Sequence, residues 1–387
     1  MVSPILDTLT GPFGVSAAQI GLFVTAIAFP AIFLIPIGGV LTDRIGRKPL
    51  LVAGLLLFGG GGTAVALTSD FTIALGLRFI QGVGMAATFP AIVSSIRDLY
   101  SDTEEATAQG LRVGVSGASQ AVFTTAAGFL VVLAWQYPFF LYAAAFPVAL
   151  ALVVWFDEPM TPRSDPGRDH RYDGLDMYLT GVLGVISYRR VLMILLAHGL
   201  AFFALFSFMT YNSLIVVGAA GGGAAEAGIV VALFSIVYAA VATQVGRITS
   251  RFGGRRIPLI ASQILLGGGL VIFAMSPHSI VAIVGATILA LGMGVVAPMY
   301  RSLISGFAHQ EIRGGLVSVG EAMGWVAVTL APIAIGLTVS RLEGTLGTIP
   351  SLQMALIGAG VVVGIVGVFA VIIAERSVHP PAEQTVS

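Results

Sequence analysis

The 387-residue chain contains no cysteine and few charged residues. The lack of cysteine excludes disulfides, thiolate metal sites and cysteine nucleophiles. Only 10% of the residues are charged, whereas 57% are hydrophobic and the mean hydropathy is +0.97, which excludes a soluble enzyme or a secreted scaffold. The 19 basic and 19 acidic residues cancel, so no net charge attracts a nucleic acid. We therefore expect a protein that lies in a lipid bilayer.

Long stretches without Asp, Glu, Lys or Arg predict the membrane-spanning helices. One span needs about 20 apolar residues to cross ~30 Å of hydrocarbon, and these stretches are too long and uniformly apolar for the strands of a barrel. We predict an all-α membrane protein with eleven helices, at 17–41, 49–69, 79–96, 113–133, 136–156, 191–217, 227–246, 257–277, 279–300, 322–340 and 351–374. The third and tenth helices are expected to begin earlier, near Phe71 and Gly314, which places Arg78 and Glu321 inside membrane segments.

The basic residues fall on one side of the predicted membrane. All of them except Arg341 and Arg78 lie in the loops and the tail on the side that also holds the C-terminus. Cytoplasmic loops of membrane proteins carry an excess of Lys and Arg. We therefore expect a multi-pass protein of the cell membrane with a cytoplasmic C-terminus.

Three glycine-containing patterns occur twice, in the same order and at nearly one offset. The pairs are 39–46 with 246–253, 59–62 with 267–269, and 84–90 with 292–298. Such a repeat predicts two pseudo-symmetric helical bundles. We expect an N-terminal bundle at 1–156, a cytoplasmic linker with an amphipathic surface helix at 157–190, a C-terminal bundle at 191–375 and a cytoplasmic tail at 376–387.

The repeat leaves the predicted span at 191–211 without a partner in this chain. The first residues would then correspond to the final turn of a helix that precedes Met1. We expect that most of the first helix of the N-terminal bundle is missing because of a truncated or misassigned start. A genuine eleven-helix variant, or a simple outer tail over residues 1–16, would also fit the sequence.

A loop rich in glycine and charge joins the first two spans and reads GVLTDRIGRKP over residues 39–49. Its glycines allow a tight turn between packed helices, and an aspartate among three cations can hold helix ends together. The loop resembles the signature G-x-L-x-D-R-x-G-R-K of the major facilitator superfamily at every defining position. A second segment, RFIQGVG at 78–84, is similar to the R-x-x-Q-G-x-G signature of the proton-coupled members.

The resemblance implies two six-helix bundles that rock about a central site and open it to each side in turn. It also implies a cytoplasmic gate in which Asp43 and Arg47 act with the acid Asp98. The gate residues are then Gly39, Asp43, Arg44, Gly46, Arg47 and Asp98. In the second half, Ser250 and Gly306 replace both acidic partners, so we expect the charge network to be one-sided.

Charges inside membrane segments mark the candidate transport site. A charge at mid-helix costs about 2.5–3.5 kcal/mol, so Arg78 and Glu321 are expected to face the bundle interior. Glu321 is a candidate for proton binding or for a fixed charge that stabilises the closed inner gate, and Arg78 for attracting an anion, tuning a proton site or packing. The other polar candidates for the proton and substrate site, or for interhelical hydrogen bonds, are Gln81, His198, Tyr211 and Asn212.

These observations predict a secondary active transporter that moves a small organic solute by alternating access and couples it to protons. No nucleotide-binding loop, metal-ligand set or catalytic constellation is found in the spans, so we expect no enzyme activity, no cofactor and no metal. Efflux is favoured over metabolite uptake, although the segment 124–129 keeps only one glycine of the G-P-x-x-G-G pattern of drug exporters. The sequence is also compatible with a non-transporting sensor or an inactive truncated transporter. We expect a monomer in the bilayer.

Overall fold

The computed structural model describes residues 3–100, 102–158, 183–307 and 313–377. This part of the chain contains 11 helices that are long and apolar enough to cross a membrane, as the sequence predicts. Apolar helices satisfy all their backbone hydrogen bonds internally, which is why they are stable in lipid. The amphipathic helix expected within 157–190 falls mainly outside the described residues.

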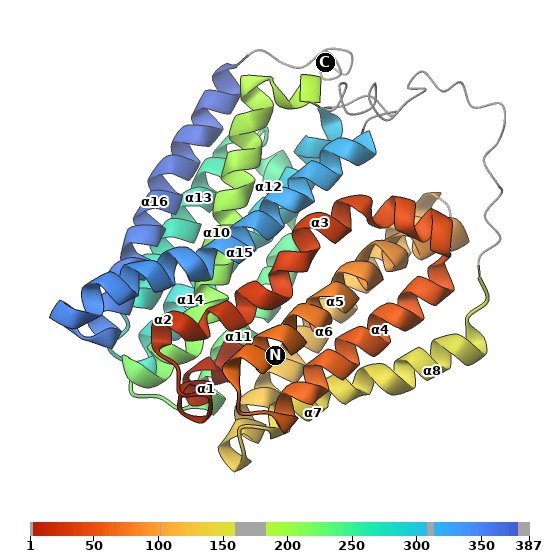
Figure 1. Ribbon diagram of the computed structural model, residues 1–387. Helices are drawn as coiled ribbons and strands as arrows, with labels where there is room; N and C mark the ends of the chain where they lie inside the picture. The colour runs from red at the N-terminus through yellow and green to blue at the C-terminus, as the bar shows by residue number, and fades with distance from the viewer. Residues whose placement is uncertain (1–2, 101, 159–182, 308–312, 378–387) are drawn as a thin grey trace.

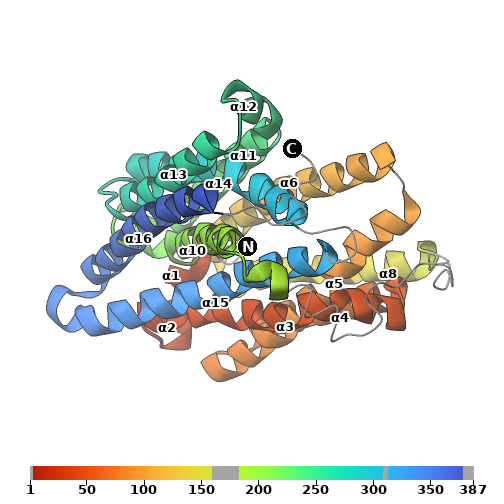
Figure 2. The ribbon, with the colours of Figure 1, turned by 90° about the horizontal axis from the view of Figure 1, so that it is seen from above.

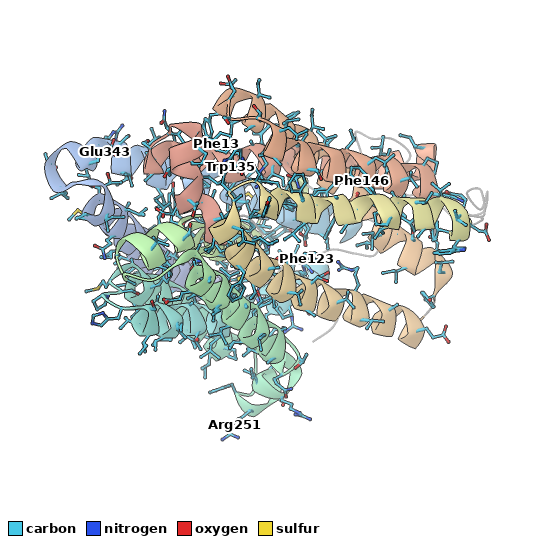
Figure 3. The ribbon with its side chains drawn as sticks, turned by 90° about the horizontal axis from the view of Figure 1, so that it is seen from below. Phe13, Phe123, Trp135, Phe146, Arg251 and Glu343 are labelled. Carbon is cyan, nitrogen blue, oxygen red and sulfur yellow. The ribbon has the colours of Figure 1, made fainter. Side chains whose placement is uncertain are left out.

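The first bundle is coloured red to yellow in Figure 1. Its described elements are η1 (Ser3–Ile5), α1 (Leu6–Phe13), α2 (Ala17–Ile20), α3 (Leu22–Ile45), α4 (Arg47–Ala64), η2 (Val65–Leu67), α5 (Phe71–Leu99), α6 (Asp102–Leu133), α7 (Tyr137–Phe140), η3 (Leu141–Ala144) and α8 (Ala145–Trp155). The short segments α1 and α2 precede the long helix α3, and Phe13 of α1 packs against Trp135 with the ring centroids 5.3 Å apart (Figure 3).

The second bundle is coloured green to blue. Its described elements are α10 (Arg189–Gly218), α11 (Ala224–Ala242), α12 (Val245–Arg251), α13 (Arg256–Ala274), α14 (Ser279–Gly306), α15 (Arg313–Leu346) and α16 (Thr348–Arg376). Seen from above, α13 and α16 lie on the opposite side of the molecule from α4 and α8 (Figure 2).

The repeated glycines form similar close helix contacts in both bundles. A Cβ atom at Gly61 of α4 would lie only 2.7 Å from the carbonyl oxygen of Leu77 in α5. In the second bundle, a Cβ atom at Gly269 of α13 would lie 2.6 Å from the backbone nitrogen of Leu289 in α14. Because small residues let membrane helices approach closely, the two glycine runs explain why α4 packs on α5 and α13 packs on α14.

The two bundles meet mainly along two helix pairs, α3 with α15 and α6 with α11, and the short segments η1, α1 and α2 also pack on α10, α11 and α15. The Thr25 hydroxyl of α3 donates to the carbonyl oxygen of Thr329 in α15 at 3.2 Å. A Cβ atom at Gly128 of α6 would lie 2.7 Å from the Ala224 carbonyl oxygen of α11. These contacts lie toward the end of the molecule that carries α1 and α2, which we call the α1 end (Figure 1).

The opposite end carries Arg47, Arg251 and Arg376, and we call it the arginine-rich end. Toward this end the bundles spread apart (Figure 1). Arg251 at the tip of α12 and Glu343 near the end of α15 lie at distant corners of the molecule (Figure 3). The printed contacts between the bundles therefore lie toward the α1 end, and the helix ribbons diverge toward the arginine-rich end.

Candidate transport site

A cavity of about 470 Å³ lies between the two bundles. The first bundle lines it with residues of α3, α5, α6 and η3, and the second with residues of α10, α11 and α14. A concave site of this volume is in the range that binds small molecules. Its polar lining includes Arg78, Arg112, Ser116, Gln120, Ser235 and Arg301. Among the described residues, no Asp or Glu lines this cavity.

Arg78 of α5 is buried and held mainly by neutral groups. Its side chain is only 2% exposed, and Nη1 donates to Gln81 Oε1 at 2.6 Å and to the Tyr142 hydroxyl at 3.3 Å. The guanidinium carbon lies 4.5 Å from the ring centroid of Phe23 and 5.8 Å from that of Phe139. Aromatic faces attract a cation electrostatically, which offsets part of its desolvation. Arg78 has no carboxylate within ion-pair distance in the described part of the chain.

Glu321 of α15 pairs with Arg301 of α14. Nε of Arg301 lies 3.0 Å from Oε1 of Glu321, and the glutamate side chain is 18% exposed. His198 of α10 borders a small void together with this pair, and its ring packs edge-on against Tyr300. The His198 side chain is buried, and its Nδ1 makes no hydrogen bond within the described residues. A titratable carboxyl, a guanidinium and an imidazole thus meet beside the cavity.

Arg112 of α6 brings a third guanidinium to the cavity, from the side of the first bundle. Burial lowers the pKa of Arg112, Arg301 lowers it further through charge repulsion, and Glu321 raises it. Arg112 and Arg301 therefore line one cavity from opposite bundles, and Glu321 pairs with Arg301 beside it.

The loop between α3 and α4 forms a charge cluster at the arginine-rich end. Gly46 has a φ of 97°, which favours glycine, and it lets the chain reverse between the two helices. Arg47 is buried, and its Nε lies 2.8 Å from Oδ2 of Asp98 at the end of α5. The backbone N–H groups of Arg47 and Lys48 donate to the carboxylate of Glu158 at 2.5 Å and 2.7 Å. A carboxylate at a helix N-terminus stabilises the helix, so Glu158 fixes the start of α4.

The structure therefore brings Arg47 and Asp98 together and places Gly46 at the turn between their helices. Gly39 lies within α3, and the side chains of Asp43 and Arg44 fall outside the described residues. In the second half, Ser250 lies exposed in the short helix α12, and its hydroxyl donates to the carbonyl oxygen of Arg247 at 2.9 Å.

Two other sequence candidates take part in helix packing. The Tyr211 hydroxyl donates to the Pro332 carbonyl oxygen at 3.0 Å, and Nδ2 of Asn212 donates to the Ala227 carbonyl oxygen at 2.8 Å. Both side chains are fully buried, and their bonds tie α10 to α15 and to α11. Gln81, by contrast, contacts the cavity residue Arg78 directly.

Sequence reasoning placed Arg112 and Arg301 in loops, whereas the structure places both in helices that line the cavity. The helix α14 continues to Gly306, beyond the uncharged stretch that ends at residue 300. A basic residue near the end of a span is usually a marker of topology, so the sequence offered no signal that separates these two arginines from the others. Within the described residues, no group of three or more His, Asp or Glu side chains is placed to hold a metal ion.

Two membrane bundles with a ligand-sized cavity between them are the arrangement found in transporters. The sequence matches the profile of the Major Facilitator Superfamily over residues 1–221 and 194–386. The chain therefore belongs to the Major Facilitator Superfamily, as the resemblance of its sequence motifs predicts.

The relatives include multidrug transporters. The chain is 26% identical over 333 residues to Multidrug resistance protein 1 of Bacillus subtilis (strain 168), which covers 84% of this chain and 82% of that protein. It is 24% identical over 361 residues to the multidrug transporter MdfA of Edwardsiella ictaluri (strain 93-146), covering 90% and 83%. A shorter segment of 116 residues is 34% identical to the bacillibactin exporter of Bacillus subtilis (strain 168), covering 29% of each chain.

Solved structures share the fold at low sequence identity. A bacterial homolog of the human lysosomal transporter Spinster, in an inward-facing and occupied conformation, has a TM-score of 0.77 at 16% identity and covers 97% of this chain and 93% of that one. A mutant of the nucleoside transporter NupG has a TM-score of 0.75 at 11% identity, covering 95% and 94%.

Proposed function

We propose that this protein exports a small amphipathic organic solute by alternating access and exchanges it for protons. The cavity between the bundles is the solute site, and the Arg301–Glu321 pair beside it is the proton site. The observation that carries this proposal is the position of Glu321, a carboxyl in a membrane helix that pairs with a cavity-lining arginine. The exporters and multidrug transporters among the relatives support the outward direction.

The arginine-rich end is, in this proposal, the cytoplasmic end. The excess of basic residues at this end supports that orientation. Because the bundles are in contact at the α1 end, the proposal takes the cavity to be closed toward the outside and reached from the cytoplasm. The other access state would require the contacts between α6 and α11 to open, and the loop cluster around Arg47 to come together with the second bundle.

A proton on Glu321 would change the charge of the cavity without a large movement. The neutral carboxyl would no longer compensate Arg301, so the cavity would gain one unit of uncompensated positive charge. At the separations within such a site, one unit charge changes the energy of a bound ion by about 1–4 kcal/mol. This change is of the size needed to couple proton binding to solute binding.

The Arg301–Glu321 pair also favours a second candidate function, proton-driven uptake of a metabolite. If the solute itself binds Arg301, protonation of Glu321 releases the arginine for the solute, and both would then be carried together. Exchange and co-transport differ in the direction of solute movement under one pH gradient, so a single experiment separates them.

The test uses the full chain reconstituted in proteoliposomes under imposed pH gradients. Movement of an anionic probe, naphthalene-2-sulfonate, and of a cationic probe, ethidium, is followed together with the lumenal pH. We expect solute movement against its own gradient, with protons moving in the opposite direction for exchange or in the same direction for co-transport. The absence of any movement that depends on the pH gradient would contradict proton coupling.

A further inference from the structure

We infer that the cavity selects an organic anion with an aromatic or other apolar body. This inference deepens the proposed function and rests on it, because it names the class of solute that the transport site takes. It requires only that the cavity is the solute site. Because a proton on Glu321 adds positive charge to the cavity, an anionic solute would bind together with the proton, so the inference favours co-transport, the second candidate function, over exchange. The charges and the shape of the cavity lining carry it.

The charge of the described lining is positive. Arg78, Arg112 and Arg301 all line the cavity, and no described lining residue is an Asp or Glu. Glu321 is paired with Arg301 and offsets one positive charge. Arg78 has only the amide of Gln81, the hydroxyl of Tyr142 and aromatic rings around it, so its charge is not compensated by a carboxylate.

Arg78 also keeps unused hydrogen-bonding capacity. Its Nε makes no hydrogen bond within the described residues, although the side chain is almost fully buried. A buried charged donor without a partner is costly, and an anionic acceptor would remove that cost. The planar guanidinium matches a carboxylate or sulfonate in shape and forms charge-assisted hydrogen bonds with it. A cation in the same cavity would be repelled.

The lining from α10 and α11 is largely aromatic and apolar. Phe202, Leu205 and Phe206 of α10 and Phe234 of α11 belong to this lining. Apolar lining of this kind stabilises a ring or chain by removing it from water, at about 25 cal/mol per Å² of buried apolar surface. A solute with an anionic group toward α5 and α6 and an apolar body toward α10 and α11 therefore fits both walls.

The test is a binding measurement on the purified full chain in detergent, with no membrane gradient. Three probes share one ring system: naphthalene-2-sulfonate is an anion, naphthalene-2-sulfonamide is neutral at pH 7, and 2-naphthylmethylammonium is a cation. We expect the sulfonate to bind at least about tenfold more tightly than the sulfonamide, and the ammonium to bind most weakly. Equal affinities, tightest binding of the ammonium, or no measurable binding of the sulfonate would overturn the inference.

Substitutions of lining residues test whether the sulfonate binds in the cavity. Arg78→Gln should weaken sulfonate binding by about tenfold or more and Arg78→Lys by less, because lysine keeps the charge but not the planar fork. Since Arg78 is packed among aromatic rings, a second substitution avoids its packing. Ser116→Asp adds a carboxylate to the exposed cavity wall and should weaken sulfonate binding, whereas Ser116→Asn should leave it within about twofold.

Arg251→Gln, at the exposed tip of α12, is the control for a change of charge far from the cavity and should leave sulfonate affinity unchanged. Unaltered sulfonate affinity in both Arg78→Gln and Ser116→Asp would overturn the inference. Failure of the anion preference can be told apart from failure of the proposed transport function. Selective sulfonate binding without any flux would contradict transport alone, whereas flux of ethidium without sulfonate binding would contradict the anion preference alone.

Discussion

In the first bundle, Arg78 is held by an amide, a phenol and aromatic rings, whereas in the second bundle Arg301 is paired with the carboxylate of Glu321. The first arrangement leaves a permanent positive charge at the cavity. In the proposed function, a proton on Glu321 would leave the second charge uncompensated. The two bundles would then contribute a fixed charge and a switchable charge to one site.

The arginine-rich end shows a second difference between the bundles. In the first, Arg47 is buried, paired with Asp98, and preceded by a turn that Glu158 holds in place. In the second, Ser250 occupies the position of the acidic loop residue and is exposed. The loop of the first bundle is therefore held by an ion pair and by backbone hydrogen bonds. In the loop of the second bundle, the described residues form no ion pair.

The largest effect should come from removing the switchable charge. We expect Glu321→Gln to reduce solute movement driven by a pH gradient to background, because glutamine cannot release or bind a proton. Exchange of labelled for unlabelled naphthalene-2-sulfonate without a gradient should continue. The charged or titratable groups near this carboxyl are Arg301 of α14, His198 of α10 and, from the cavity lining, Arg112 of α6 and Tyr238 of α11.

The matched control lies on the same helix. Glu343 is partly exposed near the far end of α15 and away from the cavity lining, so Glu343→Gln should leave gradient-driven flux in proteoliposomes unchanged. Full gradient-driven flux in Glu321→Gln would show that the proton is carried elsewhere. His198→Gln would then be the next variant to measure, because this side chain lies beside the same pair.

The fold followed closely from the sequence because lipid imposes one strong constraint on every span. Uncharged stretches predict the eleven apolar helices found in the described part of the chain. The high cost of a charge in hydrocarbon predicts that Arg78 and Glu321 avoid lipid, and the structure buries Arg78 and pairs Glu321 with Arg301. The boundaries were less accurate. The predicted fifth span is divided into α7, η3 and α8, and α14 extends past its uncharged stretch.

The partners of the site residues could not be predicted, because they come from segments far apart in the chain. Nothing in the local sequence links Arg78 to Tyr142 or Phe23, and nothing assigns Arg301 to Glu321. A basic residue near a helix end looks the same in sequence whether it faces water outside the membrane or a polar cavity within it. Only the packing of the bundles distinguishes Arg301, which lines the cavity, from Arg251 at the tip of α12.

The next largest effect is expected from a substitution at the contact between α6 and α11. A Cβ at Gly128 would lie 2.7 Å from the Ala224 carbonyl oxygen, so Gly128→Val should force α6 and α11 apart at the α1 end. Overpacking of this kind costs about 1–3 kcal/mol, enough to shift access by roughly tenfold. Because the chain has no cysteine, Ser116→Cys provides a single thiol in the cavity, and its labelling from the α1 side should increase.

Gly114 provides the comparison within the same helix. No atom lies within 4 Å of a Cβ built there, so Gly114→Val should not change the labelling of the cavity thiol. Equal labelling in the two valine variants would mean that the contact between α6 and α11 does not control access from the α1 end.

A smaller effect is expected from the fixed loop of the first bundle. Asp98→Asn removes the carboxylate that pairs with buried Arg47 and should lower the free energy of unfolding by about 1–3 kcal/mol, less than for a fully buried pair because Asp98 is partly exposed. Thermal unfolding in detergent measures this loss. Asp70→Asn at the start of the same helix should be nearly neutral, since asparagine also accepts the capping hydrogen bond from Ile73 N–H. Equal losses in both variants would mean that the Arg47 pair adds no specific stability.

The smallest effect should come from giving the second bundle the acidic residue that it lacks. Ser250→Asp places a carboxylate near the exposed Arg247 and Arg251, and surface ion pairs contribute about 0–1 kcal/mol. The position that corresponds to Asp98 is occupied by Gly306, so the new carboxylate would not recreate the buried pair of the first bundle. We expect a thermal midpoint close to that of the unmodified chain. A stabilisation as large as the loss in Asp98→Asn would show instead that both loops can hold the same ion-pair network, and that the difference between the bundles lies in one side chain alone.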